Sequence, residues 1–394
     1  MRILVVADCY LPSEKSSARL VHDLAAEFAR QCHEVTVLAP SDTGAGGVER
    51  QAGTGITVVR FKTGQIKGAR HAIRAVNEMS LSFLAYARCR RMLLKNPHDL
   101  IVFYSPSIFF GPLVAWLRRK WHAKTYLVLR DIFPDWAVDT GVLRKGTVYR
   151  VFKAFEQLQY RAADVIGVET SRSVDYFEGT AHAGKVELLR NWTPVQDPPP
   201  VTGRFRKQLG LEGKVVFFYG GNIGVAQDMD NILRLAKRLH DRQDLHFLLV
   251  GTGSEVSRLQ QAVADDGIRN LTIHPAVEQD AYFSMLAEFD VGLVTLDRRL
   301  KTYSNTGKIL GYMRCGLPIV ASHNPGNDLS DLLHASGAGL GSINGDDDLF
   351  RDNVLRLCDP ETRRVMGERS RQLLRNEFAV DRIAAQIVDS ASRS

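Results

Sequence analysis

The sequence predicts an α/β protein made of two consecutive doubly wound domains. Apolar runs typical of buried parallel strands alternate with helical patterns in both halves of the 394-residue chain. Between the halves lies the segment NWTPVQDPPPV, residues 191–201, whose prolines exclude a helix or a sheet. We therefore expect a first domain over residues 1–195, a second over 196–375, and a C-terminal helix over 376–394 that is able to pack back on the first domain.

The elements of the first half follow from its apolar runs. The opening run and four later ones are rich in aliphatic and β-branched residues, as strands are. Leu20, Leu24, Ala25 and Phe28 form one helical face after the first run. The expected strands are 2–7, 33–39, 100–104, 125–129 and 165–169, and the expected helices are 17–30, 110–120 and 148–162.

The second half repeats the alternation. The expected strands are 214–219, 246–250, 271–274, 291–295 and 318–321, and the expected helices are 228–240, 254–264, 279–288 and 306–314. An amphipathic helical stretch follows over 360–390. Two such domains in tandem make a cleft, in which ligands bind at the carboxyl ends of the strands.

Composition narrows the class of protein. No run of 18 apolar residues predicts a membrane-spanning helix, and MRILVVADCY at the start is better explained as a first strand than as a secretion signal. The five cysteines lie far apart with no CxxC pair, which argues against a disulfide framework and a zinc site. We therefore expect a cytoplasmic location.

The net charge of +7 is unevenly distributed. Residues 62–124 hold twelve lysines and arginines and only two acids, Glu78 and Asp99. Such a basic face fits an anionic membrane surface, an anionic acceptor or nucleic acid, or it is simply a solvated surface. Within it, residues 72–94 fit either a membrane-facing amphipathic helix or a helix packed on the core.

Two glycine-containing loops follow strands of the second half and precede helices. They are GGNIG at 220–224 and GTGS at 251–254. Glycine lets the backbone approach a ligand closely, and the N–H groups at a helix start attract phosphate. Two such loops on neighbouring strands favour anion or nucleotide binding over turn chemistry alone.

A third candidate is the start of the helix expected at 306–314. Ser304, Asn305 and Thr306 are capping residues that also offer polar groups to a ligand. Gly307 and Lys308 follow them. A lysine in a first turn opposes the helix dipole, which favours a functional role for Lys308 in pairing with a diphosphate.

One pair of acids imitates a metal-binding motif. Asp228 and Asp230 form a DxD pattern at a predicted helix start, where aspartates cap the helix and complement its dipole. We favour capping over metal binding.

Taken in order, these motifs resemble those of family 4 glycosyltransferases of the GT-B fold. The segments are GGNIG, LLVGTGS, HPAV, SNTGKILGYMRCGLPIVAS, SGAGL and DDD in the second half, with HEVTVLAP, LRDIFPDW, ADVIGVETS and LRNWTP in the first. The resemblance covers nearly the whole chain and is greatest to bacterial enzymes that assemble O-antigen and capsule, such as N-acetylfucosamine-type transferases.

The resemblance implies a retaining transfer from a nucleoside diphosphate sugar without a bound metal. In the second domain it implies that Gly221, Asn222, Ile223 and Gly224, together with Ser304, Asn305, Thr306, Gly307 and Lys308, hold the phosphates. Gly251 joins this donor site, and the backbone near Val277 meets the base. In the first domain Asp131 and Arg130 face the sugar, and Ser16, Ser17 and Arg19 line the acceptor side.

The sequence departs from the family pattern at four places. Asn222 and Gln227 stand where the family often has Arg and Lys, and Tyr303 and Gly311 where it often has two glutamates. Arg130 replaces a histidine, and Ser16-Ser17 replaces a Gly-Gly pair. Neutralisation of the diphosphate then falls to Lys308, with Arg298 or Arg299 as further candidates, and the ribose contact is in doubt.

The resulting hypothesis is a glycosyltransferase, peripheral on the inner face of the cell membrane, that acts in surface polysaccharide (O-antigen, capsule or lipopolysaccharide) synthesis. Its expected donor is a UDP-sugar, an N-acetylated hexosamine or deoxyhexosamine, and its expected acceptor is a lipid-diphosphate-linked saccharide, with no nucleic acid partner. Two alternatives stay open: a nucleotide-sugar epimerase of the same architecture, and a non-catalytic nucleotide-sugar-binding partner of a transferase. A dehydrogenase is disfavoured because no GxGxxG follows the first strand.

Overall fold

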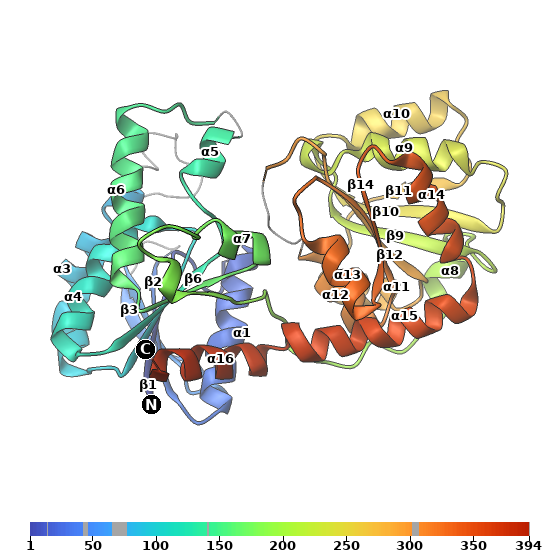
Figure 1. Cartoon of the computed structure of the whole chain (residues 1–394). Coiled ribbons are helices and arrows are strands. Elements are labelled where there is room, and N and C mark those ends of the chain that lie inside the picture. The colour runs from blue at the N-terminus through green and yellow to red at the C-terminus, as the bar shows by residue number, and fades with distance from the viewer. Residues whose placement is uncertain (14, 42–45, 65–76, 140–141, 302–306, 394) are drawn as a thin grey trace. The chain divides into compact units, whose positions relative to one another are not determined.

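The chain forms two compact units. A computed structural model describes the protein except for residues 14, 42–45, 65–76, 140–141, 302–306 and 394 (Figure 1). The first unit comprises Met1–Pro194 together with Ala379–Ser394, and the second comprises Val195–Phe378. The sequence predicted boundaries at residues 195 and 375. In the structure the second unit ends at Phe378, and the C-terminal helix that follows belongs to the first unit.

The first unit is built on a sheet with the strand order β3-β4-β2-β1-β5-β6-β7-β8. All neighbouring strands are parallel except β3 and β4, which are antiparallel. The strands are β1 (Arg2–Val6), β2 (Glu34–Pro40), β3 (Gly47–Arg50), β4 (Thr57–Phe61), β5 (Leu100–Tyr104), β6 (Lys124–Leu129), β7 (Val165–Val168) and β8 (Val186–Leu188). The five strands expected from the sequence are confirmed, and β3, β4 and β8 are additional.

Helices cover both faces of this sheet (Figure 1). Alternate residues of β1 point to opposite faces, so Ile3 and Val5 pack with α1 and α16, whereas Leu4 and Val6 pack with α3 and α4. The helices are α1 (Ser16–Arg30), α3 (Leu81–Lys95), α4 (Gly111–Trp121), α5 (Asp135–Asp139), α6 (Thr147–Ala162), α7 (Ser171–Asp175) and α16 (Val380–Arg393), with short 3-10 turns at Ile108–Phe110 and Ala183–Lys185.

The C-terminal helix is fixed to the first unit by polar contacts as well as by its apolar face. Ile383 and Ile387 are buried against the sheet. The Glu187 carboxylate accepts hydrogen bonds from Gln386 Nε2 at 3.0 Å, from Ser390 Oγ at 2.8 Å and from the Tyr126 hydroxyl at 2.8 Å. The stretch expected as one helix over 360–390 is therefore divided: α15 (Pro360–Leu373) packs in the second unit, a π-helical turn (Leu374–Phe378) follows, and α16 starts in the first unit.

The second unit holds a fully parallel sheet with the strand order β11-β10-β9-β12-β13-β14. The strands are β9 (Val215–Asn222), β10 (Leu245–Thr252), β11 (Leu271–His274), β12 (Val291–Thr295), β13 (Ile319–His323) and β14 (Gly339–Ile343). The helices are α8 (Arg204–Gln208), α9 (Met229–Arg238), α10 (Val256–Asp265), α11 (Gln279–Leu286), α12 (Lys308–Cys315), α13 (Leu329–Ser336) and α14 (Asp347–Arg356), with a 3-10 turn at Val225–Gln227. The expected strands and helices are confirmed, and β14, α8, α13 and α14 are additional.

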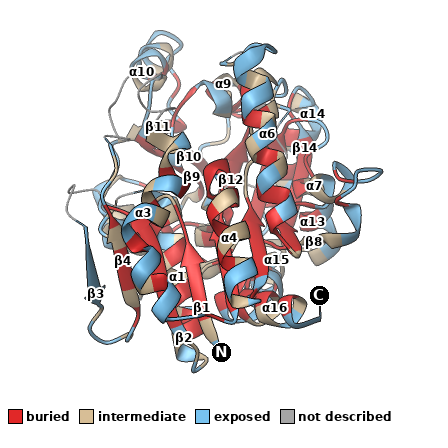
Figure 2. Cartoon of the chain, turned by 90° about the vertical axis from the view of Figure 1, so that its left-hand side faces the viewer, coloured by how far each residue is buried: buried red, intermediate tan, exposed pale blue. Residues whose placement is uncertain are grey.

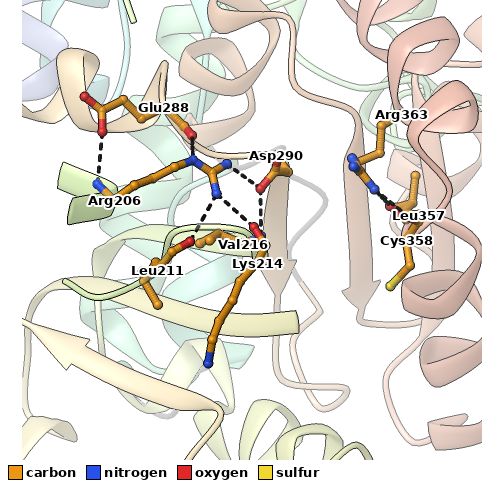
Figure 3. A network of polar contacts seen from close by, with 9 residues as sticks. All are labelled: Arg206, Leu211, Lys214, Val216, Glu288, Asp290, Leu357, Cys358 and Arg363. Atoms are coloured by element: carbon orange, nitrogen blue, oxygen red, sulfur yellow. Dashed lines mark hydrogen bonds and ion pairs between the residues drawn. The ribbon is translucent and has the colours of Figure 1, made fainter. Parts of the chain in front are cut away.

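Arg206 links the start of the second unit to its sheet through a network of hydrogen bonds (Figure 3). The Arg206 guanidinium donates to the Glu288 carbonyl at 2.6 Å, to the Lys214 carbonyl at 2.8 Å and to the Asp290 carboxylate at 2.6 Å. Asp290 in turn accepts from the Val216 backbone N–H at 2.8 Å. This network joins α8 to the N-terminal ends of β9 and β12. It thereby fixes β9, whose carboxyl end lies at the candidate site.

Candidate functional site

The carboxyl ends of β9 and β10 form one edge of the candidate site. The two strands pair in parallel register through Val250↔Gly220 and Gly251↔Gly221, so both glycine loops begin at the same edge of the sheet. Gly221 adopts φ +130°, a conformation that side chains disfavour. A Cβ on Gly251 would lie 1.8 Å from the Gly221 carbonyl oxygen. Glycine at 251 is therefore required by the approach of the neighbouring backbone, whatever ligand the edge receives.

A pocket of about 420 Å³ opens at this edge. It brings together four residues that the sequence assigned to donor binding, Gly221, Gly251, Val277 and Lys308. Gly220 and Thr252 of the two predicted glycine loops also line it, together with Val250, Ala276 and Tyr282, which sequence analysis missed. Tyr282 comes from α11 and packs edge-on against Phe218, with ring centroids 5.7 Å apart. Among the described residues, the pocket therefore combines an apolar, aromatic wall with backbone polar groups and a single lysine.

Lys308 is the cationic group of the pocket. It is the first residue of α12, and its ammonium donates to the Tyr219 hydroxyl at 2.9 Å while lying 4.1 Å from the centroid of that ring. No carboxylate among the described residues forms an ion pair with it. Burial lowers the pKa of Lys308 to about 7. A partly desolvated cation without a protein anion beside it is stabilised by an anionic ligand.

Two tyrosine hydroxyls hold the backbone of this edge. The Tyr219 hydroxyl, which accepts from Lys308, donates to the Asn222 carbonyl at 2.6 Å. The Tyr312 hydroxyl accepts from the Gly220 N–H at 3.2 Å and donates to the Leu293 carbonyl at 3.1 Å. These contacts fix the Gly220–Asn222 backbone and the lysine together, which is the preorganisation that anion binding requires.

Three of the predicted phosphate-binding residues do not line the described pocket. The Ile223 side chain is fully buried, and its backbone N–H donates to the Thr252 carbonyl at 2.8 Å, so Ile223 anchors the loop and does not present a donor to the pocket. Asn222 Nδ2 donates to Gln227 Oε1 at 3.1 Å, across the backbone of Gly224. Direct contact of Ile223, Asn222 or Gly224 with a ligand therefore stays a prediction.

The segment before α12 is described only in part. Ser304, Asn305 and Thr306 lie outside the described residues, as does Tyr303. Gly307 is exposed and is the N-cap residue of α12. Gly311 faces α11, because a Cβ there would lie 3.5 Å from Leu286 and 3.8 Å from Tyr282.

The two arginines considered as helpers of Lys308 have other contacts. The Arg299 guanidinium is bidentate on Asp297, with N···O distances of 2.5 and 3.0 Å, so its charge is already paired. Arg298 lies over Gly345, where an added Cβ would come within 2.8 Å of the guanidinium. Neither residue is among those that line the described pocket, which leaves Lys308 as its cation.

In the first unit, Arg130 and Asp131 follow the carboxyl end of β6. The Arg130 guanidinium donates to the carbonyls of Leu189 at 3.0 Å and Arg190 at 3.3 Å, and lies 4.7 Å from the centroid of the Trp192 ring. Burial raises the pKa of the Asp131 carboxyl, and the Arg130 charge opposes that rise. Arg130 thus holds the 189–192 segment and limits the rise in the pKa of Asp131. The roles of both residues towards a sugar stay predictions.

The loop that follows Asp131 is held by a second carboxylate, Asp135. It accepts hydrogen bonds from Tyr176 at 2.6 Å, Tyr149 at 2.8 Å and Lys153 at 3.1 Å. Burial alone would raise the pKa of Asp135, but these donors hold it below its ordinary value. Sequence analysis missed this network, since the donors lie on α6 and at the end of α7, distant in sequence.

The residues expected on the acceptor side lie at the start of α1. Ser16 and Ser17 are the first two residues of that helix, and the sulfur of Cys9 lies 3.1 Å from Ser17 Oγ. Arg19 forms an ion pair with Asp23 at 3.4 Å, one turn further on. The three residues therefore share the first turn of α1, after the carboxyl end of β1, and their contact with an acceptor stays a prediction.

The two aspartates of the DxD pattern contact different partners. Asp228 is the N-cap of α9 and its carboxylate accepts from Asn344 Nδ2 at 2.8 Å, whereas Asp230 pairs with Arg258 at 2.8 Å. In the described ranges, no group of three or more His, Cys, Asp or Glu side chains is placed to hold a metal ion. The capping interpretation holds for the position of Asp228, although its side chain makes no cap hydrogen bond.

Comparisons with known proteins agree with this architecture. Residues 17–192 match the family model described as "Glycosyl transferase 4-like domain", and residues 213–359 match "Glycosyl transferases group 1". The chain is 29% identical over 209 residues to the protein of Escherichia coli (strain K12) named as the colanic acid biosynthesis glycosyl transferase WcaI. It is 26% identical over 230 residues to the glycosyltransferase WbjE of Pseudomonas aeruginosa. These matches cover 51% and 57% of the chain and the same shares of the two relatives, so they extend over little more than half of each.

The fold itself is shared with solved structures. HepE of Anabaena, determined in complex with UDP, superposes on the whole chain with a TM-score of 0.69 at 16% identity, and all of that chain is covered. Together, the two family models cover the larger part of both units. The chain belongs to the family 4 glycosyltransferases of the GT-B fold.

Proposed function

We propose that the protein transfers a sugar, with retention of configuration, from a UDP-sugar to a lipid-diphosphate-linked saccharide during synthesis of a surface polysaccharide. The observation that carries the donor side is the pocket at the ends of β9 and β10, with Lys308 as its cation. A diphosphate held by backbone N–H groups and one lysine needs no metal for neutralisation, so we propose a metal-independent reaction. The complex of HepE with UDP supports this class of donor, and the name of WcaI, which refers to colanic acid biosynthesis, supports this setting.

The first unit supplies the acceptor side in this proposal. Asp131 follows a strand end, and burial raises the pKa of its carboxyl, which places an acidic group of perturbed pKa at the ligand-binding edge of the sheet. We propose that Asp131 acts on the sugar and that the first turn of α1 meets the acceptor. We further propose that the protein acts in the cytoplasm, at the inner face of the cell membrane, where it would meet a lipid-linked acceptor.

The first experiment measures thermal stabilisation by a panel of nucleotides and nucleotide sugars. UDP and one UDP-sugar should raise the melting temperature of wild-type protein, since a ligand that binds only the folded state stabilises it. Lys308→Ala should remove that effect. Stabilisation by an adenine dinucleotide but by no nucleoside diphosphate would contradict the proposal.

The second experiment separates transfer from the alternatives. Wild-type protein with UDP-sugar and a lipid-linked acceptor extract should release UDP and label the lipid fraction, and Asp131→Asn should stop labelling while UDP binding persists. Conversion of the UDP-sugar without acceptor would indicate an epimerase. Binding without any turnover, in extracts that support a related transferase, would indicate a non-catalytic partner.

A further inference from the structure

The helices α3, α4 and α6 carry a pronounced excess of positive charge. Across these three helices there are ten lysines and arginines and one acid, Glu156. Glu156 is fully buried and pairs with Lys153 at 2.5 Å. No carboxylate of these helices therefore faces water, whereas Arg90, Arg91, Arg119 and Arg161 are exposed. The bases are Arg88, Arg90, Arg91 and Lys95 on α3, Arg118, Arg119 and Lys120 on α4, and Arg150, Lys153 and Arg161 on α6.

Parts of the same helices are exposed (Figure 2). Large apolar side chains are among the exposed residues. On α6, Val148, Val151 and Leu158 are 55%, 39% and 43% exposed, and their spacing of three and seven residues places them on one face. On α3, Phe83 is 70% exposed. Single exposed apolar residues are ordinary, but a stripe along one helix that also carries bases is the pattern of a surface that meets a membrane.

A pocket of about 640 Å³ lies between the C-terminal ends of α4 and α6. The two helices approach closely, since a Cβ on Gly111 would lie 2.7 Å from the backbone nitrogen of Gln159. Leu158 lines the pocket, so the apolar stripe of α6 leads into it. The basic residues of its lining are Arg118, Arg119, His122, Lys124 and Arg161.

The one acid of this pocket is already engaged. Asp164 pairs with Arg118 and accepts from the Thr125 N–H and hydroxyl, each at 2.9 Å. Arg119 and Arg161 form no ion pair with any residue that the structure describes. The pocket therefore presents two unpaired guanidinium groups beside an apolar side chain, which suits a phosphate ester attached to hydrocarbon.

Helix dipoles account for part of this pattern. Arg118, Arg119, Lys120 and Arg161 lie in last turns, where cations are favourable. The dipole does not account for Arg150, near the start of α6, nor for the exposed valines beside it. It also does not account for the absence of solvent-facing acids from all three helices.

We propose that the outer face of the α3, α4 and α6 layer binds the surface of an anionic phospholipid bilayer, with a lipid phosphate held between Arg119 and Arg161. A nucleic acid would use the bases but not the apolar stripe, which favours lipid. This surface would bring the protein to a lipid-linked acceptor. The purpose of membrane binding rests on the proposed function, whereas the binding itself does not.

The test is vesicle flotation with the full chain at low and high salt. Wild-type protein should bind vesicles of phosphatidylcholine with phosphatidylglycerol and should not bind phosphatidylcholine alone. The double variant Arg119→Glu, Arg161→Glu should bind these vesicles at least about 30-fold more weakly. Each base near an anionic surface contributes about fivefold to the partition coefficient. Lys207→Glu, Arg269→Glu is the matched control, because it changes the net charge equally at exposed residues of the second unit.

A neutral change separates lipid from other polyanions. Val151→Ser, Leu158→Ser keeps every charge and should weaken vesicle binding while leaving any binding to duplex DNA unchanged. Equal flotation of the wild type and the Arg119, Arg161 variant would overturn the proposal, as would salt-sensitive binding to DNA with none to vesicles. Circular dichroism and melting temperature confirm that each variant is folded.

Binding of UDP keeps this test independent of the proposed function. The second unit holds the donor pocket, so the Arg119, Arg161 variant should be stabilised by UDP as the wild type is. Loss of flotation with intact UDP binding supports the membrane surface. Flotation of a protein that binds no nucleotide would contradict the proposed transfer and leave the surface standing.

Discussion

If the proposed donor site is right, Lys308 should set both the affinity for the donor and its dependence on pH. Burial lowers its pKa from 10.5 to about 7, while its ammonium donates only to the Tyr219 hydroxyl among described residues. A bound diphosphate returns the pKa towards its ordinary value, because an anion favours the charged form. Binding then takes up a proton above pH 7, and affinity for UDP should fall by up to about tenfold per pH unit between about pH 7 and pH 10.

Two substitutions isolate this effect. Lys308→Met removes a charged hydrogen bond to the diphosphate, which is worth about 1.5–3 kcal/mol, so UDP should bind about 10- to 150-fold more weakly and without the pH slope. Lys308→Arg keeps its charge at every accessible pH, so any affinity that remains should also lose the slope.

The same lysine lowers stability when no anion is bound. Its folded-state pKa lies below its unfolded value, so the unfolded chain binds more protons between about pH 7 and 10.5. The penalty on folding is complete below about pH 7 and disappears above 10.5. The gap corresponds to about 5 kcal/mol, which partial exposure reduces to about 1–3 kcal/mol. Lys308→Met should therefore be more stable than the wild type at pH 7 and below.

Calorimetric titration of UDP in two buffers with different ionisation enthalpies measures the proton uptake directly. About one proton per UDP should be taken up by the wild type at pH 8 to 9, and none by Lys308→Met. An affinity of the wild type that does not change across this range, together with equal binding by Lys308→Met, would refute the assignment of Lys308 to the donor site.

Three further changes test the framework around the site. Arg206→Met removes the donor to Glu288, Lys214 and Asp290 and should lower the free energy of unfolding by about 3–5 kcal/mol in urea titrations, since a partly buried carboxylate loses its partner. Gly251→Ala places a methyl group 1.8 Å from the Gly221 carbonyl oxygen. It should lower the free energy of unfolding by about 1–3 kcal/mol and weaken UDP binding. A variant as stable as the wild type would show that the strands separate freely. Burial lowers the pKa of His246 from 6.5 to about 4, so stability should fall by up to about 3 kcal/mol as pH drops from 6.5 towards 4, and His246→Gln should flatten that slope in urea titrations at several pH values.

The sequence determined most of the strands and the helices with strong apolar patterns. β5 and β12 lie where their apolar runs predicted, because a fully buried parallel strand needs an unbroken run. β14, with the sequence GLGSI, was missed because two glycines and a serine carry no strand signal. It forms a strand since β13 offers it a complete row of backbone partners, a non-local cause.

The candidate site shows the same division. Glycines after strands and a lysine that opposes a helix dipole are local irregularities, so Gly221, Gly251 and Lys308 were predicted from the order and type of residues. Val277 was predicted only from the family resemblance. Tyr282 entered the pocket only through the packing of α11 on β9.

Tertiary structure alone decided how each group is used. It took Ile223 into the core, paired Arg299 with Asp297, and engaged Arg130 with the 189–192 backbone. The reason is physical: a residue's type fixes which interactions it is able to make, whereas burial and the neighbours brought by distant segments fix which of them it makes.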